Sequence, residues 1–288
     1  MRRLGLLLRF PGAFLAPAIL VLASIVLFPT GYLLYLSVRH WVITRPFQYF
    51  SGLDNYRLVL TSPSFWGAAQ TTLVFIVATV AVTLVLGTAL AVALNRPFAG
   101  RGVVRALVVL PLLVPPIVAG FTWRFLLNRE IGMLGSWILP AVGVEASMLA
   151  HPDLAMVSIV IADVWSRTSF MFLILLAALQ GIPGSLYEAA RIDGASDAQE
   201  FVFITLPLLL PAMLVGVIFR AIEAVNTFDL IFVMTQGGPG TATQTLSIYG
   251  WRTAFTSFDI GRGAAIAVVM VVFAVLATTV LSRRVLER

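Results

Sequence analysis

The sequence predicts an all-α, polytopic membrane protein with six transmembrane helices and both termini in the cytoplasm. Hydrophobic residues make up 60% of its 288 residues, and its mean hydropathy is +0.99. Only 11% of the residues are charged, compared with about 25% in ordinary soluble domains. Six apolar runs reach the length of about twenty residues that a helix needs to cross a bilayer. They are too continuous for outer-membrane strands, which alternate over roughly ten residues.

The predicted spans cover residues 14–36, 71–94, 103–126, 154–179, 201–221 and 264–281. The first follows a cluster of arginines, as a signal peptide would, but it is longer than a signal-peptide core and no small-x-small site closes it. The third contains Pro111, Pro115 and Pro116, so we expect a kink or break there. Protein or water must satisfy the freed backbone groups, which places this helix in the bundle interior or along a pathway.

Arginine positions predict the orientation, because the cytoplasmic ends of spans are enriched in Arg and Lys. The N-terminus, the loop after the second span and the C-terminus are assigned to the cytoplasm by Arg2, Arg3, Arg9, Arg96, Arg101, Arg105, Arg283, Arg284 and Arg288. Loop 128–153 suits the outside because its acids outnumber its arginine, and loop 37–70 is also assigned there despite its arginines. Loop 181–200 is then cytoplasmic although it is net acidic, so we expect its acids to serve binding rather than topology.

The residue inventory excludes several chemistries. The chain has no cysteine, which rules out disulfides, thiolate metal sites and cysteine nucleophiles. Its two histidines, His40 and His151, lie far apart in predicted loops and indicate no metal site. The chain also has no lysine and therefore no Walker-type phosphate loop. The net charge of +6 comes from arginines near membrane edges and does not indicate nucleic acid. The spans contain no Ser–His or metal-binding constellation, which disfavours an intramembrane enzyme.

The loop between the fourth and fifth spans is a polar island. A Pro-Gly pair stops the fourth span, and Ser185 to Glu188 has the spacing of a capping box. A short helix over about 186–193 should follow, with Gly194 at its C′ position. Ser196 to Gln199 is a second capping box, which starts the fifth span. The caps alone fit a generic interfacial helix at least as well as a binding element.

The spacing within this loop resembles a family signature. Glu188-Ala189-Ala190, three residues, Gly194, nine residues and Ile204-x-Leu206-Pro207 closely resembles the signature loop of permeases of binding-protein-dependent ABC importers. Other segments resemble the carbohydrate-uptake branch of that family, namely Gly52 to Tyr56, Ser64 to Trp66, Phe228-Asp229, Met234 to Pro239, which includes a Gly-Gly-Pro turn signal, and Phe258 to Ala265. The resemblance covers residues 13–281. Within the family, the chain is similar to the first permease of maltose and glycerol-3-phosphate importers.

The resemblance implies a division of the chain and a docking surface. Residues 1–66 would hold an N-terminal stub, the first span and an external loop, residues 67–282 the transmembrane core with a coupling helix near 185–195, and 283–288 a cytoplasmic tail. The implied ATPase-docking residues are Glu188, Ala189, Ala190, Arg191, Asp193, Gly194, Ile204, Leu206 and Pro207. Glu188 could act as a helix cap or as an ion-pair partner of an arginine on the ATPase, and both roles stay open.

The resemblance also implies partners and a location. ATP and Mg would bind two separate ABC ATPase subunits, and this chain would hold no cofactor. A second permease would form a heterodimer with it, and an external solute-binding protein would deliver a sugar-like substrate. The expected location is a bacterial or archaeal cytoplasmic membrane, in contact with lipid and without nucleic acid. The alternative is a stand-alone secondary transporter or channel, although the sequence shows no convincing internal repeat.

Polar residues inside or beside spans are candidates for the substrate pathway, because a charge at the centre of a span costs roughly 2.5–3.5 kcal/mol on insertion scales. The candidates are Asn226, Asp229, Phe228, Glu223, Asp163, Arg167 and Trp165. Asp163 and Arg167 lie four residues apart and can pair on one helix face, although such a pair could equally be a structural tether. Trp165 and Trp123 could stack on a sugar, or simply anchor and pack. Arg220 begins a run of polar residues that leads to Asp229.

Overall fold

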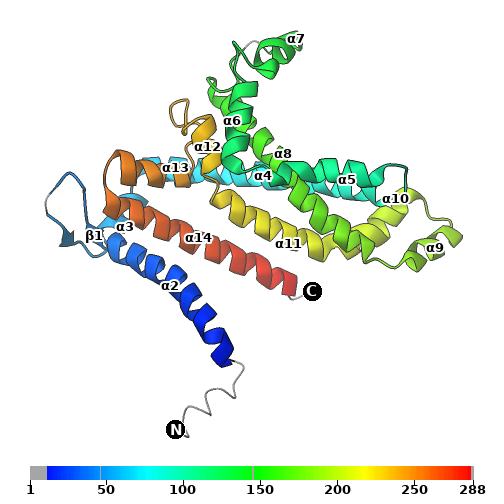
Figure 1. The fold of residues 1–288 in the computed structure, drawn as a ribbon, viewed down its shortest axis with the longest axis horizontal. Coiled ribbons are helices and arrows are strands. Elements are labelled where there is room, and N and C mark those ends of the chain that lie inside the picture. Colours follow the sequence, from blue (N-terminus) through cyan, green and yellow to red (C-terminus); the bar gives the residue numbers. More distant parts are fainter. Residues whose placement is uncertain (1–11, 46, 145, 287–288) are drawn as a thin grey trace, which may run out of the picture. The chain divides into compact units, whose positions relative to one another are not determined.

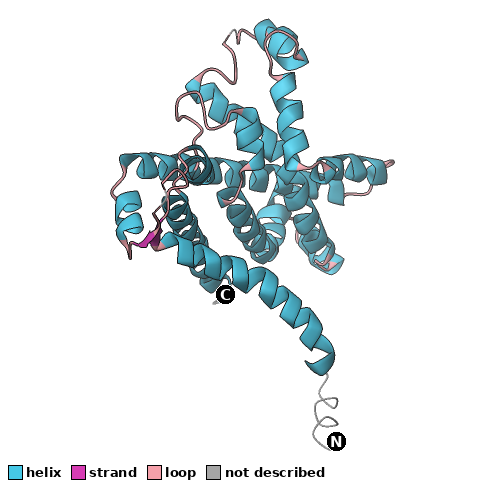
Figure 2. Ribbon diagram, turned by 60° about the vertical axis from the view of Figure 1, so that its left-hand side comes forward, coloured by secondary structure: helices cyan, strands magenta, loops and turns pink. Residues whose placement is uncertain are grey.

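A computed structural model describes residues 12–45, 47–144 and 146–286. Helices account for nearly all of the regular structure, with one two-stranded ribbon (Figures 1 and 2). The chain divides into two compact units, one formed by Met1–Ser62 with Gly250–Val271 and the other by Pro63–Tyr249 with Val272–Arg288. The orienting arginines Arg2, Arg3, Arg9 and Arg288, and Glu145 of the predicted external loop, lie outside the described residues.

The core of the larger unit is three long helical segments packed on one another. They are α4 (Pro63–Asn95), α8 (Pro152–Gln180) and the continuous run α10, η3 and α11 (Asp197–Glu200, Phe201–Thr205 and Leu206–Val225). Met171 of α8 is fully buried between Gly87 of α4 and Gly216 of α11. A Cβ added at Gly87 would lie 2.6 Å from Met171 Cγ, and one at Gly216 would lie 2.7 Å from Met171 Sδ. Glycine therefore allows both helices to approach α8 closely.

The third predicted span is broken, as its prolines predict. It consists of α5 (Arg101–Val109), η1 (Leu110–Leu113) and α6 (Pro116–Leu126), and the two halves meet at an angle of 98°. Proline has no amide hydrogen to donate and disfavours a helical residue before it, so the helix stops at Val114. Two serines of α8 donate to backbone carbonyls beside the break: Ser169 to Val108 at 2.6 Å and Ser166 to Pro111 at 3.4 Å.

All six predicted spans are helical in the structure, apart from the break at Val114 and Pro115 in the third. Four helices of the described chain are long and apolar enough to cross a membrane: Leu15–Ser37, Pro63–Asn95, Pro152–Gln180 and Asp197–Val225. The broken pair provides a fifth span if its two halves count as one. The sixth predicted span lies in α14 (Ile260–Leu286), whose described apolar stretch, Ile260–Leu276, is shorter. Short elements between the spans are η2 (Leu134–Ile138), α7 (Leu139–Ala141), α9 (Gly184–Ile192), α12 (Asp229–Met234), α13 (Leu246–Trp251) and η4 (Arg252–Thr256).

The smaller unit is organised around a buried asparagine. It contains α2 (Gly12–Ser37), the antiparallel strands β1 (Arg39–His40) and β2 (Tyr49–Phe50), α3 (Asp54–Leu60) and the start of α14. Asn55 is 1% exposed, and its amide donates to the carbonyls of Ser37 at 2.9 Å and Arg39 at 2.8 Å. A Cβ on Gly261 would collide with the Arg39 carbonyl oxygen. Asn55 and Gly261, both in segments with family resemblance, therefore hold this unit together.

Candidate functional site

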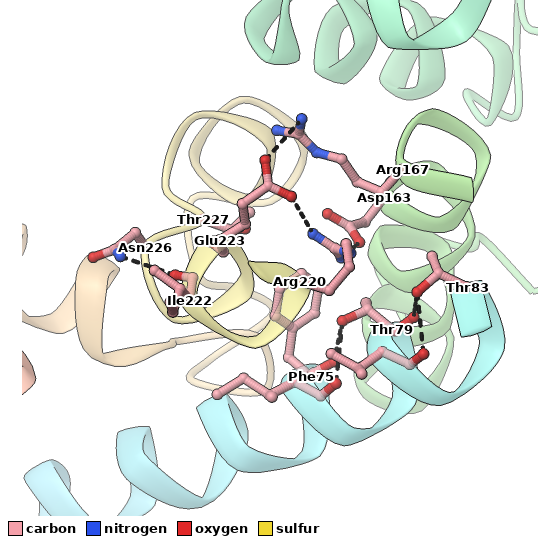
Figure 3. Close-up of polar contacts among 12 residues, drawn as sticks. Phe75, Thr79, Thr83, Asp163, Arg167, Arg220, Ile222, Glu223, Asn226 and Thr227 are labelled. Carbon is pink, nitrogen blue, oxygen red and sulfur yellow. Dashed lines mark hydrogen bonds and ion pairs between the residues drawn. The ribbon is translucent and has the colours of Figure 1, made fainter. Parts of the chain in front are cut away.

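Four charged side chains form a network between α8 and α11, which we call the charge cluster: Asp163, Arg167, Arg220 and Glu223. Arg220 Nη2 donates to Asp163 Oδ2 at 2.5 Å, and Arg220 Nη1 to Glu223 Oε2 at 3.1 Å. Arg167 Nη1 lies 3.3 Å from Glu223 Oε1. Figure 3 shows the resulting chain of alternating charges, in which each helix contributes one acid and one base.

The charge cluster is buried at one end and open at the other. The side chains of Arg220 and Asp163 are 0% and 3% exposed, whereas those of Arg167 and Glu223 are 25% and 39% exposed. Removing one member of a buried pair leaves an uncompensated charge, so the inner pair binds α8 to α11. The outer pair remains partly exposed.

The pairing within the cluster differs from the sequence prediction. Asp163 and Arg167 do lie one turn apart on α8, but each pairs with a residue of α11 instead of with the other. The reason is that Arg220 enters from the neighbouring helix and is fully buried against Asp163. Arg220 was recognised in the sequence only as the start of a polar run, because its partner lies 57 positions away.

The remaining pathway candidates occupy the end of α11 and the start of α12. Asn226 is the exposed C-cap residue of α11, and its amide donates to the Ile222 carbonyl at 2.9 Å (Figure 3). Asp229 is exposed at the first position of α12, and Phe228 stacks on Phe232 with ring centroids 5.0 Å apart. Asn226 follows Glu223 by three residues, so it continues the same helical edge past the open end of the cluster.

Trp165 lies on α8 between the two cluster residues of that helix. It is 40% exposed, and its ring meets that of Trp123 of α6 edge to face, with centroids 6.1 Å apart. The contact between the two rings is therefore part of the packing of α6 against α8, and part of the Trp165 side chain remains exposed.

The polar island contains the short helix α9, and the capping box predicted for the start of this helix does not form. The helix begins at Gly184, Pro183 is its N-cap and no side chain caps it, so the box from Ser185 to Glu188 is wrong. The physical reason is that the helix starts before Ser185, which places this serine inside the first turn instead of at the cap. Gly194 follows with φ of +83°, as a C′ glycine does.

The second capping box is confirmed at the start of α10. Ser196 Oγ accepts from the Gln199 amide at 3.4 Å, and Gln199 Oε1 accepts from the Ser196 amide at 2.8 Å. These bonds satisfy two of the backbone donors that a helix start leaves free.

Most of α9 projects side chains that the rest of the described chain does not cover. Glu188, Ala189 and Gly194 are exposed, Ala190 is half-buried, and Ile192 is 87% exposed. The exposed face of α9 therefore combines small residues, one large apolar side chain and acids. Asp193 is also exposed, as the C-cap of α9.

Two side chains of α9 instead turn back to the following segment. Arg191 Nε donates to Glu200 Oε1 at 2.8 Å, and the hydroxyls of Tyr187 and Thr205 are hydrogen-bonded at 3.0 Å. The hydrogen bond from Arg191 to the Glu200 carboxylate, together with its negative charge, raises the pKa of Arg191. Of the predicted docking residues, Arg191 is therefore engaged within the chain.

The rest of the family signature lies in η3 and at the start of α11. Ile204 is half-buried in the π-helix η3, Leu206 begins α11, and Pro207 is exposed in the first turn of α11, where its missing amide hydrogen is tolerated. These three residues set how the fifth span begins, and only Pro207 is well exposed among them.

Metal or cofactor sites are not evident in the part of the chain that the structure describes. No group of three or more His, Cys, Asp or Glu residues gathers there in a way that could hold a metal ion. A polar cavity of about 520 Å³ lies beside α6 and α12, and its lining includes Arg124, Asn128, Glu130, Ser147 and Gln236.

Comparison with known proteins identifies relatives along nearly the whole chain. The trehalose/maltose transport system permease protein MalF of Thermococcus litoralis is 41% identical over 253 residues, or 88% of this chain and 85% of the relative. The sn-glycerol-3-phosphate transport system permease protein UgpA of Agrobacterium fabrum is 34% identical over 279 residues, or 96% and 94% of the two chains.

A solved structure has the same fold. It is a chain of a bacterial ABC transporter involved in the import of the acidic polysaccharide alginate, with a TM-score of 0.82 at 21% identity, covering 96% of this chain and 94% of that one. Residues 83–288 match the family described as binding-protein-dependent transport system inner membrane component. Since that match spans most of the chain and the relatives align along most of their length, the chain belongs to this family of inner-membrane permease components of ABC importers.

Proposed function

We propose that this chain is one of two permease subunits of an importer that moves a sugar or sugar-like solute from an external binding protein into the cytoplasm. Two separate ABC ATPase subunits, which bind ATP and Mg, drive the movement through α9. A second permease subunit completes the channel. This proposal displaces the alternative of a stand-alone secondary transporter or channel, because the family is a component of binding-protein-dependent systems.

The main support for the substrate class is that several relatives are named as permeases for hydroxylated solutes. The names of three of them refer to trehalose and maltose, to sulfoquinovosyl glycerol and to glycerol-3-phosphate. Each of these solutes carries two or more free hydroxyl groups. They differ in charge, so the class is defined by its hydroxyl groups, which neutral and charged hydrogen-bonding side chains can both recognise.

The exposed surface of α9 supports its role in docking the ATPase. Glu188 makes no capping bond, so its carboxylate is available to an arginine of the partner. Ala189, Ala190 and Gly194 present little side-chain volume, which suits a close fit in a groove. Ile192 and Asp193 border this surface, and apolar burial of Ile192 would add affinity.

The open end of the charge cluster supports a role in the solute pathway. Arg167, Glu223, Asn226 and Asp229 offer donors and acceptors that a polyhydroxylated solute could use, and all four side chains retain some exposure. Trp165 and Phe228 could contribute an apolar face. Asp163 and Arg220 are buried and paired, so we assign them to holding α8 and α11 together.

Reconstitution of the complete importer tests this function. The permease should copurify with a second permease and an ATPase, and liposomes containing the complex should take up a labelled hydroxylated solute only with internal ATP and the binding protein. Trehalose, maltose and glycerol-3-phosphate are the first probes. Uptake by the permease alone, without an ATPase, would support the stand-alone transporter instead.

A further inference from the structure

The helix α9 is fixed to the start of the fifth span by two contacts, which we call the α9 strap: Tyr187 with Thr205, and Arg191 with Glu200. Glu200 and Thr205 are each 6% exposed, so both contacts end on buried groups. Arg191 reaches the Glu200 carboxylate with two nitrogens, Nε at 2.8 Å and Nη2 at 3.4 Å. This two-point geometry defines the direction of the guanidinium as well as its distance.

The π-helix η3 brings the two ends of the strap into register. Tyr187 and Arg191 are four residues apart and lie on one face of α9. Glu200 and Thr205 are five residues apart, and in an α-helix they would point about 140° away from each other. A π-helix has more residues per turn than an α-helix, because its hydrogen bonds join residues five apart. Residues five apart therefore point more nearly in the same direction. The π-helix η3, Phe201–Thr205, therefore places both partners on the side that faces α9.

The strap adds side-chain contacts to a connection whose turn is closed by backbone hydrogen bonds, from the Gly194 amide to the Arg191 carbonyl at 3.1 Å and from the Ala195 amide to the Ala190 carbonyl at 2.9 Å. Between α9 and α10 the backbone passes through Gly194, with φ of +83°, and Ala195. These backbone bonds close the C-terminal turn of α9 without reaching α10 or η3, whereas the strap reaches both. Beyond the strap, η3 continues directly into α11, which carries Arg220 and Glu223 of the charge cluster.

We propose that Glu200 and Thr205 are positioning residues that make α9 and α11 move as one body. When the ATPase displaces α9, the strap transfers the displacement to η3 and α11, and the inner pair of the charge cluster transfers it to α8. This inference rests on the proposed function, because it requires an ATPase that moves α9. It gives Arg191, whose side chain remains 65% exposed, a partner within this chain in addition to its predicted place beside the docking surface.

The strap is tested by measuring the distance between α9 and α11 in the assembled importer. The chain has no cysteine, so the double variant Ser185→Cys, Phe219→Cys carries two spin labels and no others on this subunit. Both positions are exposed and neither belongs to the strap; Ser185 lies on α9 next to the docking surface, three residues before Glu188. Pulsed electron paramagnetic resonance measures the distance between the labels without nucleotide and with trapped ATP. It is recorded for the labelled chain with its native strap residues (the strapped chain) and for the same chain with Tyr187→Phe and Glu200→Gln added.

A working strap predicts one narrow distance distribution in both nucleotide states, and a broader, nucleotide-dependent distribution after the two strap substitutions. The matched control is Arg96→Gln, which breaks the nearby Arg96–Asp197 ion pair of 2.7 Å without touching α9 and should leave the distribution narrow. Equal widths with and without the strap would overturn the inference. Loss of the ATPase from the strap variant would also overturn it, since the contacts would then shape the docking surface itself.

The proposed function is checked separately in the same preparation. Binding of the ATPase to the strapped chain should reduce the mobility of the label at Ser185. If it does not, docking at α9 is wrong whatever the width of the distance distribution.

Discussion

Replacing Arg220 with methionine removes the partner of a buried carboxylate while keeping a long apolar side chain. Asp163 is 3% exposed and its ion pair with Arg220 measures 2.5 Å, so the variant leaves an acid enclosed between α8 and α11. Breaking a buried ion pair from one side costs about 3–5 kcal/mol of unfolding free energy. Glu223 is spared this penalty, because it is 39% exposed and retains Arg167 at 3.3 Å.

Two further variants turn this magnitude into a test. Arg167→Met breaks the outer, more exposed pair, and its expected cost is only about 0–1 kcal/mol. The double variant Asp163→Leu, Arg220→Met removes both buried charges. Replacing a buried pair with apolar residues is often neutral or stabilising by about 1–4 kcal/mol. We therefore expect the double variant to recover most of the stability that Arg220→Met loses.

The assay is thermal or denaturant unfolding of the purified permease in detergent, with all variants in one detergent and lipid mixture. The expected order of stability is wild type and the double variant together, Arg167→Met slightly below, and Arg220→Met lowest by a wide margin. The reasoning is refuted if Arg220→Met is as stable as Arg167→Met. It is equally refuted if the double variant is no more stable than Arg220→Met, because the buried charge would then not be the cause.

Further predictions concern packing, capping and the pathway. Gly87→Leu should cost about 1–3 kcal/mol by overpacking against Met171, whereas Gly67→Leu on the same helix meets open space and should be neutral in the same unfolding assay. Ser196→Ala should cost about 0.5–2 kcal/mol because it removes a cap, and a comparable loss in Ser185→Ala would argue against the observed start of α9. Asn226→Ala should lower solute uptake by the assembled complex without disturbing assembly, and unchanged uptake kinetics would remove Asn226 from the pathway.

Local signals in the sequence predicted much of the fold. The apolar runs gave the helical segments, the prolines at 111, 115 and 116 predicted the 98° break, and Ser196 with Gln199 predicted the start of the fifth span. Each of these features depends on residues within a few positions of one another. The first capping box failed because Pro183 can itself occupy the N-cap, so the serine two residues later was not needed there.

The parts that the sequence did not predict depend on contacts between distant segments. Arg220 and Asp163 pair across 57 positions, and no periodicity in either helix indicates which residue of the other it meets. The π-helix η3 could not be predicted from composition either, because its residues form an ordinary apolar run. The contact between Arg191 and Glu200 was therefore not predicted, and the docking role of Arg191, which rests on the family resemblance, stays a prediction.

The docking of a separate ATPase on α9 is the central claim, and cysteine cross-linking tests it most directly. Ala189→Cys introduces the only cysteine of a chain that otherwise has none, at an exposed position of α9. Ala99→Cys, exposed in the other predicted cytoplasmic loop, is the matched control. In the assembled importer we predict a strong short-range cross-link from position 189 to the ATPase chain, and a weaker one from position 99. A complex that retains its ATPase but forms no cross-link from position 189 would contradict the claim.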